Sequence, residues 1–150
     1  AAEATVIGQP GSKHLLIAME FVDGTTASVL ASAAAMPAPC TSAVLGDVAV
    51  ALGRLHLFGL VHRDVKGDNI MVSVDGHSYL CDFGLSAHVE ELRSQGGRHA
   101  VGTPDFMAPE ILGKVPRFTD RVDVWAFGIL SIELANNGRT PARDLRLPGQ

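Results

Sequence analysis

The feature that most constrains the fold of this chain is a set of three short motifs in a fixed order. The first is His-Arg-Asp-Val-Lys-Gly-Asp-Asn at residues 62–69, and Asp-Phe-Gly at 82–84 and Ala-Pro-Glu at 108–110 follow it. Short apolar runs on both sides of Asp75-Gly76 separate the first two motifs, and both residues of this dipeptide tolerate a positive φ. The spacing therefore predicts a tight β-hairpin between the first motif and the second.

Helical patterns flank this motif region. Thr41 or Ser42 can cap a helix whose apolar residues recur at three- and four-residue spacing, and Gly59 is a natural end for it. Residues 119–135 are apolar on nearly every side, which predicts a helix that is buried all round. The first helix should therefore lead directly into the first motif, and the second should lie in the core.

The two ends of the chain carry weaker patterns. Residues 14–22 form an apolar run between turn-forming residues and predict a strand, without a recognisable partner strand in the sequence. Residues 27–39 are rich in alanine and end in prolines, which predicts one short helix and then a loop. Residues 136–150 are polar, contain glycine and proline, and predict a tail.

Composition excludes several classes of function. A net charge of -4 without a basic stripe argues against nucleic acid or anionic lipid as a partner. Two cysteines outside any Cys-x-x-Cys pair, and six histidines without ligand spacing, indicate neither a disulfide framework nor a metal site held by these residue types. No uninterrupted apolar segment approaches the roughly 20 residues that span a bilayer. We therefore expect no membrane span and a cytoplasmic protein.

The three motifs, together with Gly-Thr-Pro at residues 102–104, resemble those of eukaryotic serine/threonine protein kinases. Their residues are most similar to those of the MAP-kinase-activating group. The resemblance implies an α+β fold that comprises mostly the helical C-terminal lobe and the hinge strand. Residues 1–135 would form this partial kinase domain, and residues 136–150 a tail of uncertain structure. The N-terminal lobe and the last helices of the C-terminal lobe have no counterpart, since no glycine-rich loop, strand lysine or partner glutamate precedes Met19.

The resemblance also implies the roles of the catalytic residues, with ATP and Mg²⁺ as cofactors. By this resemblance Asp64 is the catalytic base, Lys66 lies near the transferred phosphate, and Asn69 and Asp82 hold Mg²⁺. Cys81 precedes the metal-binding aspartate, where a small packing side chain is a more ordinary interpretation than a reactive thiol.

The adenine site is expected at residues 19–22. Met19 would be the gatekeeper, and the backbone of Glu20 and Val22 would bind the adenine edge, with Met71 as the floor of the pocket. A buried apolar strand is the competing interpretation of the same run.

Regulation by phosphorylation is a second implication of the resemblance. Arg63 is the residue that pairs with a phosphorylated activation segment in this family. The usual phosphothreonine would fall at His99, which leaves Ser94 as the candidate acceptor. An upstream activating kinase is thus an expected partner.

Three further residues match structural positions of the family. Thr103 is expected to bond near the catalytic loop, and Asp123 to anchor that loop from the buried helix. In the family the arginine partner of Glu110 comes from the region after the buried helix, which has no counterpart here. The only arginines after Ala135 are Arg139, Arg143 and Arg146.

Two functions of different class follow from these expectations. The first is a serine/threonine protein kinase, seen here as a fragment, that transfers a phosphoryl group from MgATP to serine or threonine hydroxyls of a protein substrate. This chain by itself would then have little activity, because the parts that hold the ATP phosphates are not in the sequence. The alternative is a catalytically inactive kinase-fold scaffold or decoy that retains only the substrate-docking half.

Overall fold

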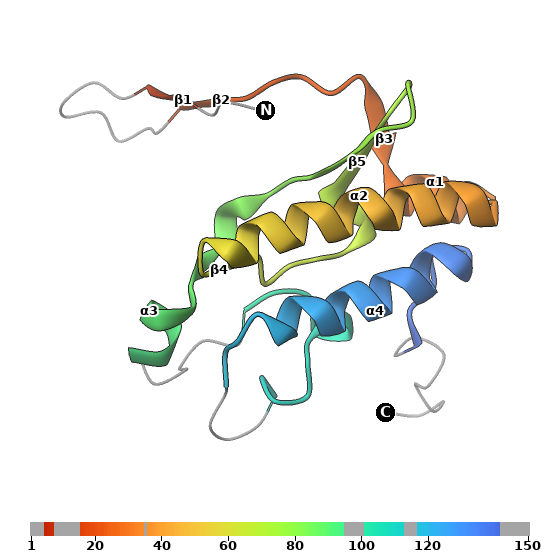
Figure 1. The fold of residues 1–150 in the computed structure, drawn as a ribbon. Helices are drawn as coiled ribbons and strands as arrows, with labels where there is room; N and C mark the ends of the chain where they lie inside the picture. The colour runs from red at the N-terminus through yellow and green to blue at the C-terminus, as the bar shows by residue number, and fades with distance from the viewer. Residues whose placement is uncertain (1–4, 8–15, 35, 95–100, 113–116, 142–150) are drawn as a thin grey trace.

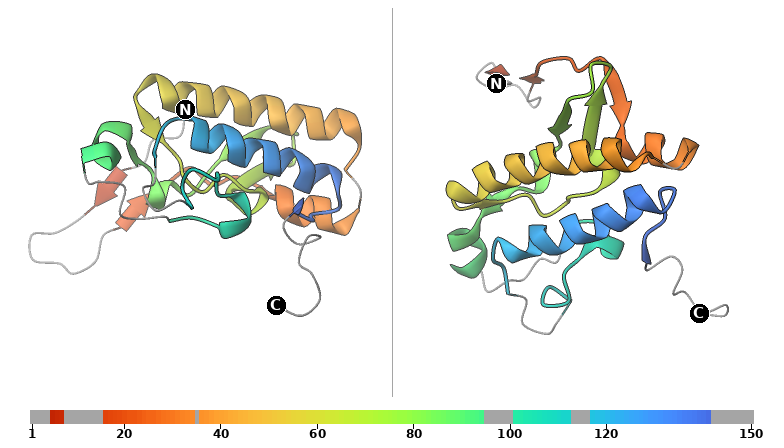
Figure 2. Two further views of the ribbon diagram at one scale, coloured as in Figure 1. Left: turned by 90° about the horizontal axis from the view of Figure 1, so that it is seen from below. Right: turned by 45° about the vertical axis from the view of Figure 1, so that its right-hand side comes forward.

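Two helices, α2 (Ala38–Leu57) and α4 (Arg121–Ala135), lie side by side and run in opposite directions (Figures 1 and 2). They are seen in a computed structural model that describes residues 5–7, 16–34, 36–94, 101–112 and 117–141. A shorter helix, α1 (Ala27–Ala33), packs against α4, and its N-cap Thr26 accepts a hydrogen bond from the amide of Val29. Together with three small sheets, these helices confirm the expected α+β class.

The largest described sheet has three antiparallel strands in the order β3 (Gly24–Thr26), β5 (Ile70–Ser73) and β6 (Ser78–Leu80). The predicted hairpin is confirmed, since β5 and β6 pair on either side of the expected turn and Gly76 has a φ of +90°. This hairpin carries the chain from the first motif to the second.

A separate two-stranded sheet lies next to the first two motifs. Strand β4 (Leu60–Val61) pairs with β7 (Ala87–His88), so the segments just before the first motif and just after the second lie side by side. A short helix, α3 (Val89–Ser94), follows β7. The pairing brings the start of the first motif next to the second motif, where the ring centroids of His62 and Phe83 are 5.0 Å apart.

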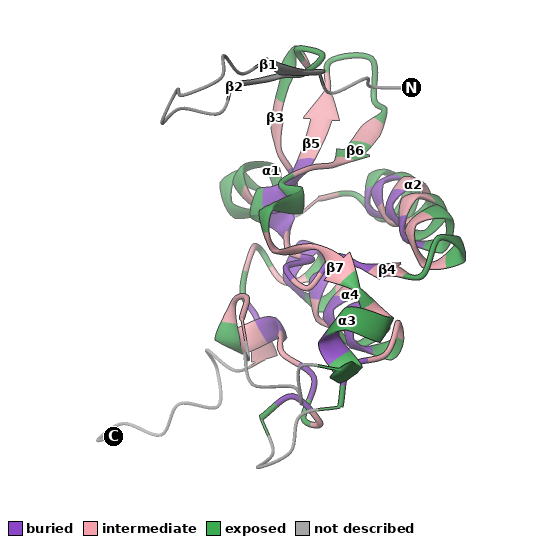
Figure 3. Ribbon diagram, turned by 90° about the vertical axis from the view of Figure 1, so that its left-hand side faces the viewer, coloured by how far each residue is buried: buried purple, intermediate pink, exposed green. Residues whose placement is uncertain are grey.

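Buried apolar side chains form two clusters, and Figure 3 shows the buried positions along the facing sides of the helices. The first lies between α1, α2, α4 and the first motif, and the second lies under the start of α4. The first consists of Ala27, Ala31, Val44, Val48, Leu52, Val65, Ile70, Phe106, Ala126, Leu130 and Leu134, and the second of Val61, Leu92, Ala108, Ile111, Phe118 and Val122.

The N-terminal strand differs from the expectation. Strand β2 covers only Leu16–Ala18 of the expected residues 14–22, of which 14 and 15 lie outside the described residues. It pairs with β1 (Thr5–Ile7), a partner strand that the sequence does not predict. Residues 19–22 are not part of a strand, and Met19 and Phe21 are 75% and 86% exposed. The buried-strand interpretation of this run is therefore wrong.

Helix α2 begins earlier than predicted. Pro37 is its N-cap and Pro39 lies in its first turn, where the missing amide proton of proline costs nothing because first-turn amides have no acceptor within the helix. Thr41 is inside the helix and donates a hydrogen bond to the Met36 carbonyl at 3.4 Å, so the predicted cap at Thr41 or Ser42 is wrong. The predicted end is confirmed, since the helix ends at Leu57 and Gly59 has a φ of +70°.

Helix α4 is buried on one side only. Val122, Ala126, Leu130 and Leu134 are buried, whereas Val124, Trp125 and Ile132 are 47%, 46% and 44% exposed. The expectation of burial all round is therefore wrong for the described residues. After α4 the chain turns through Asn137 and Gly138, both with positive φ, and the buried Thr140 donates a hydrogen bond to Asp105 at 3.1 Å. Residues 142–150 of the expected tail lie outside the described residues.

Helix α2 is also relevant to the expectation that the chain has no membrane span. Its 20 residues contain an 18-residue window with a mean hydropathy of 1.2, so by length and composition it could cross a membrane, although Asp47 and Arg54 interrupt its apolar run. One such helix is weak evidence for a membrane span. In this fold α2 contacts α4, and its Asp47 accepts a hydrogen bond from the Ser78 amide of β6 at 2.8 Å.

Candidate active site

The first motif forms a loop between α2 and β5. After α2 ends, β4 brings the chain to His62, and a single 3-10 turn at Gly67–Asn69 leads into β5. Arg63 has a φ of +69°, a conformation that is uncommon outside glycine. We call residues 62–69 the catalytic loop.

Asp123 in the first turn of α4 holds the start of the catalytic loop. Its carboxylate is fully buried and accepts hydrogen bonds from the amides of His62 at 2.8 Å and Arg63 at 2.9 Å. A third contact, at 2.8 Å, joins it to Nε2 of His56 in the last turn of α2. The hydrogen bonds from the amides of His62 and Arg63 hold the positive-φ backbone of Arg63 in place.

Sequence reasoning missed His56 as a member of this group. In the sequence it is one of six histidines without ligand spacing. Its signal is its position four residues after the buried Leu52, which places it on the buried face of α2. That face contacts α4, from which Asp123 projects.

Asp64 lies at the centre of the site, and its carboxylate accepts four hydrogen bonds. Oδ1 accepts from the amide and the hydroxyl of Thr103, at 3.0 and 2.7 Å. Oδ2 accepts from Nδ2 of Asn69 at 2.9 Å and from Nζ of Lys66 at 2.8 Å. Burial raises the pKa of Asp64, but the bonds from Lys66, Thr103 and Asn69 outweigh it and hold the pKa below its usual value. The carboxylate is therefore ionised at neutral pH.

Lys66 and Thr103 connect the catalytic loop to the segment before Ala-Pro-Glu. Nζ of Lys66 donates to the Thr103 hydroxyl at 2.8 Å as well as to Asp64. Gly102, with a φ of +117°, lets this segment approach closely, because a Cβ there would lie 2.4 Å from the Arg63 carbonyl. Asp64, Lys66, Asn69 and Thr103 thus form one connected group.

Asn69 and Asp82 offer oxygen atoms of the kind that Mg²⁺ prefers. Nδ2 of Asn69 is occupied by the carbonyl and carboxylate of Asp64, which leaves its Oδ1 as an acceptor. The Cys81 amide donates to the Asn69 carbonyl at 2.8 Å, so the residue before Asp82 is tied to Asn69. Asp82 is exposed, has a φ of +59°, and accepts one hydrogen bond from Gly84 at 3.2 Å. This donor set fits Mg²⁺, although the described residues contain no cluster of three His, Cys, Asp or Glu side chains for a metal.

The His62 side chain contacts the residues on both sides of Asp82. Its Nε2 lies 3.0 Å from the Cys81 carbonyl, and its ring meets the Phe83 ring edge to face at 5.0 Å. Burial lowers the pKa of His62, which favours the neutral ring. Burial also raises the pKa of the Cys81 thiol, which agrees with the packing interpretation of this residue rather than a reactive one.

Residues 19–22, the expected hinge, precede strand β3. Strand β3 pairs with β5, the strand that contains Met71. Met19 and Glu20 are exposed and Val22 is half-buried. Thr26 is the register partner of Met71, which is also half-buried. The roles of these residues in adenine binding stay predictions.

The expected regulatory residues lie at separate places. Nε of Arg63 donates to the Leu85 carbonyl just after the Asp-Phe-Gly motif. Ser94 is exposed at the end of α3, where its hydroxyl donates to the Glu91 carbonyl at 2.8 Å. Glu110 is half-buried and forms no ion pair with any described residue. Arg139 is exposed, whereas His99, Arg143 and Arg146 lie outside the described residues.

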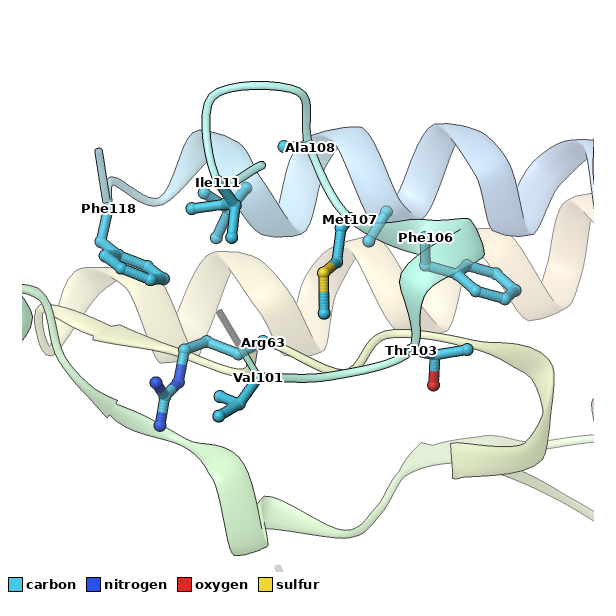
Figure 4. Close-up of a pocket in the computed structure, with 10 residues that line it drawn as sticks. Arg63, Val101, Thr103, Phe106, Met107, Ala108, Ile111 and Phe118 are labelled. Carbon is cyan, nitrogen blue, oxygen red and sulfur yellow. The ribbon is translucent and has the colours of Figure 1, made fainter. Parts of the chain in front are cut away.

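A small, mainly apolar pocket lies beside the catalytic loop, between the segment from Val101 to Ile111 and the start of α4 (Figure 4). Its polar lining residues are Arg63 and Thr103. None of Asn69, Met71 and Asp82 lines it, so it is distinct from the expected nucleotide site. The full lining is Arg63, Val101, Thr103, Phe106, Met107, Ala108, Ile111, Phe118, Val122 and Ala126.

Comparisons with known proteins agree with this arrangement. The chain is 37% identical to the serine/threonine-protein kinase ste20 of Emericella nidulans over 121 residues, which are 80% of this chain and 14% of that protein. It is 33% identical to STE20 of Debaryomyces hansenii over 138 residues, 89% of this chain and 13% of that protein. The kinase pakA of Talaromyces marneffei is 36% identical over 121 residues, 80% of this chain and 18% of that protein.

The chain therefore spans less than a fifth of the length of these curated relatives. The family model of the protein kinase domain matches residues 5–145, nearly the whole chain. From the three motifs, the group around Asp64 and this match, we conclude that the chain belongs to the protein kinase domain family.

Proposed function

We propose that this chain carries the catalytic loop of a serine/threonine protein kinase that transfers a phosphoryl group from MgATP to serine or threonine hydroxyls of proteins. The observation that supports this most directly is the Asp64 carboxylate, held ionised by Lys66, Thr103 and Asn69. An ionised, oriented carboxylate can accept the proton of a substrate hydroxyl. The names of the relatives point to the same reaction.

Each residue of the group has a separate part in this proposal. Lys66 orients one oxygen of Asp64 and supplies a positive charge close to it. Asn69 and Asp82 would hold Mg²⁺, which neutralises charge on the phosphate oxygens when it is bound. Met19, Glu20, Val22 and Met71 would bind the adenine of ATP.

Replacement of Asp64 tests the proposal. Asp64→Asn removes the proton acceptor and keeps the shape of the side chain, so transfer of labelled phosphate should fall about 10²–10⁴-fold, the usual contribution of a general base. The matched control is Asp75→Asn, the same change in the exposed turn of the hairpin. The measurement uses the full-length protein that contains this chain, with MgATP and a mixture of protein substrates. Equal activity of the two variants would contradict the proposal.

We also propose that an upstream kinase regulates the protein through Ser94 and that the protein acts in the cytoplasm. The exposed Ser94 hydroxyl is accessible for modification, and a guanidinium such as that of Arg63 can pair with a phosphate group. Phosphopeptide mapping of protein from the source cells tests the first point, since a phosphate-free Ser94 in active protein would contradict it. Imaging of the tagged protein tests the second.

The second candidate is a scaffold without catalysis. The observation that favours it is the exposed apolar side of α4 at Val124, Trp125 and Ile132, which is suited to protein binding. A wild-type protein that binds partners but neither binds MgATP nor transfers phosphate would support the scaffold. Phosphate transfer that depends on Asp64 would exclude it.

A further inference from the structure

Asp47 lies in the middle of α2, where neither the motifs nor the proposed reaction assigns it a role. It is the only acidic residue of this helix. Aspartate is a weak helix former in a helix interior, because its short side chain competes for backbone hydrogen bonds. The side chain is also half-buried, and burial of a charge is costly unless the charge gains hydrogen bonds. A contact outside α2 should therefore account for this residue.

That contact is with the free edge of the three-stranded sheet. Strand β6 is the last strand in the order β3-β5-β6, and it lies against α2 (Figure 3). The Cys81 amide donates to the Asn69 carbonyl and so points towards β5. Because residues alternate along a strand, the Ser78 amide points away from β5, and it donates to Oδ2 of Asp47 at 2.8 Å. Asp47 thus accepts a hydrogen bond that another strand would accept in a wider sheet.

Strand β6 connects this contact to the expected Mg²⁺ ligands. At its start the Ser78 amide bonds to Asp47, and just after its end the Cys81 amide bonds to the Asn69 carbonyl at 2.8 Å. Asp82 is the next residue in the chain. The three strands have only three, four and three residues, and a sheet this small depends on packing against a helix for its stability. The contact with α2 is therefore suited to fix where β6 lies.

We propose that Asp47 is a positioning residue, whose carboxylate fixes the edge of β6 on α2 and so sets where Asp82 lies relative to Asn69. The proposal rests on the proposed phosphoryl transfer for its effect on rate. Its structural part, the fixed edge of β6, can be measured without nucleotide, metal or activity.

A different role for the same carboxylate is the binding of a basic side chain of a protein partner. The half-buried position of Asp47 and the bond from the Ser78 amide to its Oδ2 argue against this role. A carboxylate that binds a partner is better placed on an exposed surface, with its oxygens free. The contact in the structure instead joins two elements of the same chain.

Hydrogen exchange at the Ser78 amide tests the contact directly, in the full-length protein without nucleotide or Mg²⁺. Asp47→Ala removes the acceptor and should raise the exchange rate about 10–100-fold, the fold-change expected for a lost bond to a charged group. Asp47→Asn keeps the length of the side chain and an acceptor oxygen, so it should retain most of the protection. Unchanged exchange of Ser78 in Asp47→Ala would overturn the proposal.

The Cys81 amide separates a positioning role from a local bond. Its own acceptor, the Asn69 carbonyl, is not altered by a change at Asp47. If Asp47 fixes where β6 lies, Asp47→Ala should raise the exchange rate of Cys81 several-fold as well, and Asp47→Asn should restore it. Faster exchange at Ser78 alone would overturn the proposal, because Asp47 would then form a bond without positioning the end of the strand.

The matched control is Arg54→Ala, which removes a charge from an exposed position of α2 about two turns further along. It should leave the exchange of both amides unchanged. Alanine is a better helix former than aspartate, so Asp47→Ala should preserve α2. Where it does not fold, Asp47→Leu makes the same test, because leucine is also a strong helix former and has no acceptor.

Kinetics connect the contact to the reaction. If Asp82 is displaced from Asn69, Asp47→Ala should need a several-fold higher Mg²⁺ concentration for its half-maximal rate, with the KM for the peptide nearly unchanged and rescue by Asp47→Asn. An unchanged Mg²⁺ requirement, or a rise in KM confined to peptides with arginine or lysine, would overturn the proposal. A wild-type protein that transfers no phosphate would refute the proposed function instead, and the exchange of Ser78 and Cys81 would still decide whether Asp47 fixes β6.

Discussion

Asp123 is a buried carboxylate with three donors from two separate segments. Two donors are amides of the catalytic loop, and the third is His56 on α2. Because all three bonds converge on one side chain, loss of any donor leaves a buried acceptor partly unsatisfied, and the cost is a desolvation penalty rather than the modest net value of a hydrogen bond. The position of Asp64 next in the chain depends on this anchor.

Replacement of His56 should therefore reduce stability. We expect His56→Ala to lower the free energy of unfolding by about 1–3 kcal/mol, the cost of leaving a buried polar group unsatisfied. His77→Ala is the matched control, since His77 is exposed in the hairpin turn and should have little effect. Urea unfolding of the two variants measures the difference. An equal loss in both would show that the His56–Asp123 contact does not contribute.

Helix α2 leads into the site and positions the start of the catalytic loop. Its buried residues Val44, Val48 and Leu52 recur every four residues and hold it against the core. Gly59 then reverses the chain in the left-handed conformation and directs it into β4. The catalytic loop starts three residues later, so the helix end determines where the loop begins.

The two glycines of this region should respond to alanine in opposite directions. Gly53 lies inside α2, and a Cβ added there would meet nothing within 4 Å, so Gly53→Ala should stabilise the protein by about 0.5–1 kcal/mol through helix propensity. Gly59 has a φ of +70°, and Gly59→Ala should destabilise it by about 1–2 kcal/mol. Thermal or urea unfolding measures both changes. The same sign for both would contradict the assigned end of α2.

At the scale of the whole molecule, several large apolar side chains of the described residues are exposed on α4 and at the end of α2. Val124, Trp125 and Ile132 lie on the outer side of α4, and Leu57 and Phe58 at the end of α2 are 86% and 77% exposed. Apolar surface of this kind on two neighbouring elements favours association, because burial of apolar area in a contact is the main favourable term in association.

The isolated 150-residue chain should therefore self-associate. The double variant Trp125→Glu and Ile132→Lys should shift it towards the monomer, because it places charges on the exposed side of α4. Val74→Lys is the control, since Val74 is 80% exposed but lies in the hairpin turn, away from α4. Analytical ultracentrifugation reports the change. A monomeric wild-type chain at micromolar concentration would contradict the expectation.

Local patterns are sufficient for several of these elements. The Asp75-Gly76 turn, the end of α2 at Gly59 and the helix before Ala135 all follow from residues that are neighbours in the chain. The run at residues 19–22 is apolar enough for a strand, yet it is exposed coil, because a strand also needs a partner and this run has none among the described strands. Propensity alone could not supply that information.

The sequence by itself determined the family, because the residues of the three motifs are close together in the chain and their chemistry is specific to one reaction. Only the tertiary structure decided which side chains hold them in place. His56 meets Asp123 across 67 residues and Gly67 meets Glu133 across 66. Such contacts depend on how α2 and α4 pack, and a single sequence carries no local pattern for that packing.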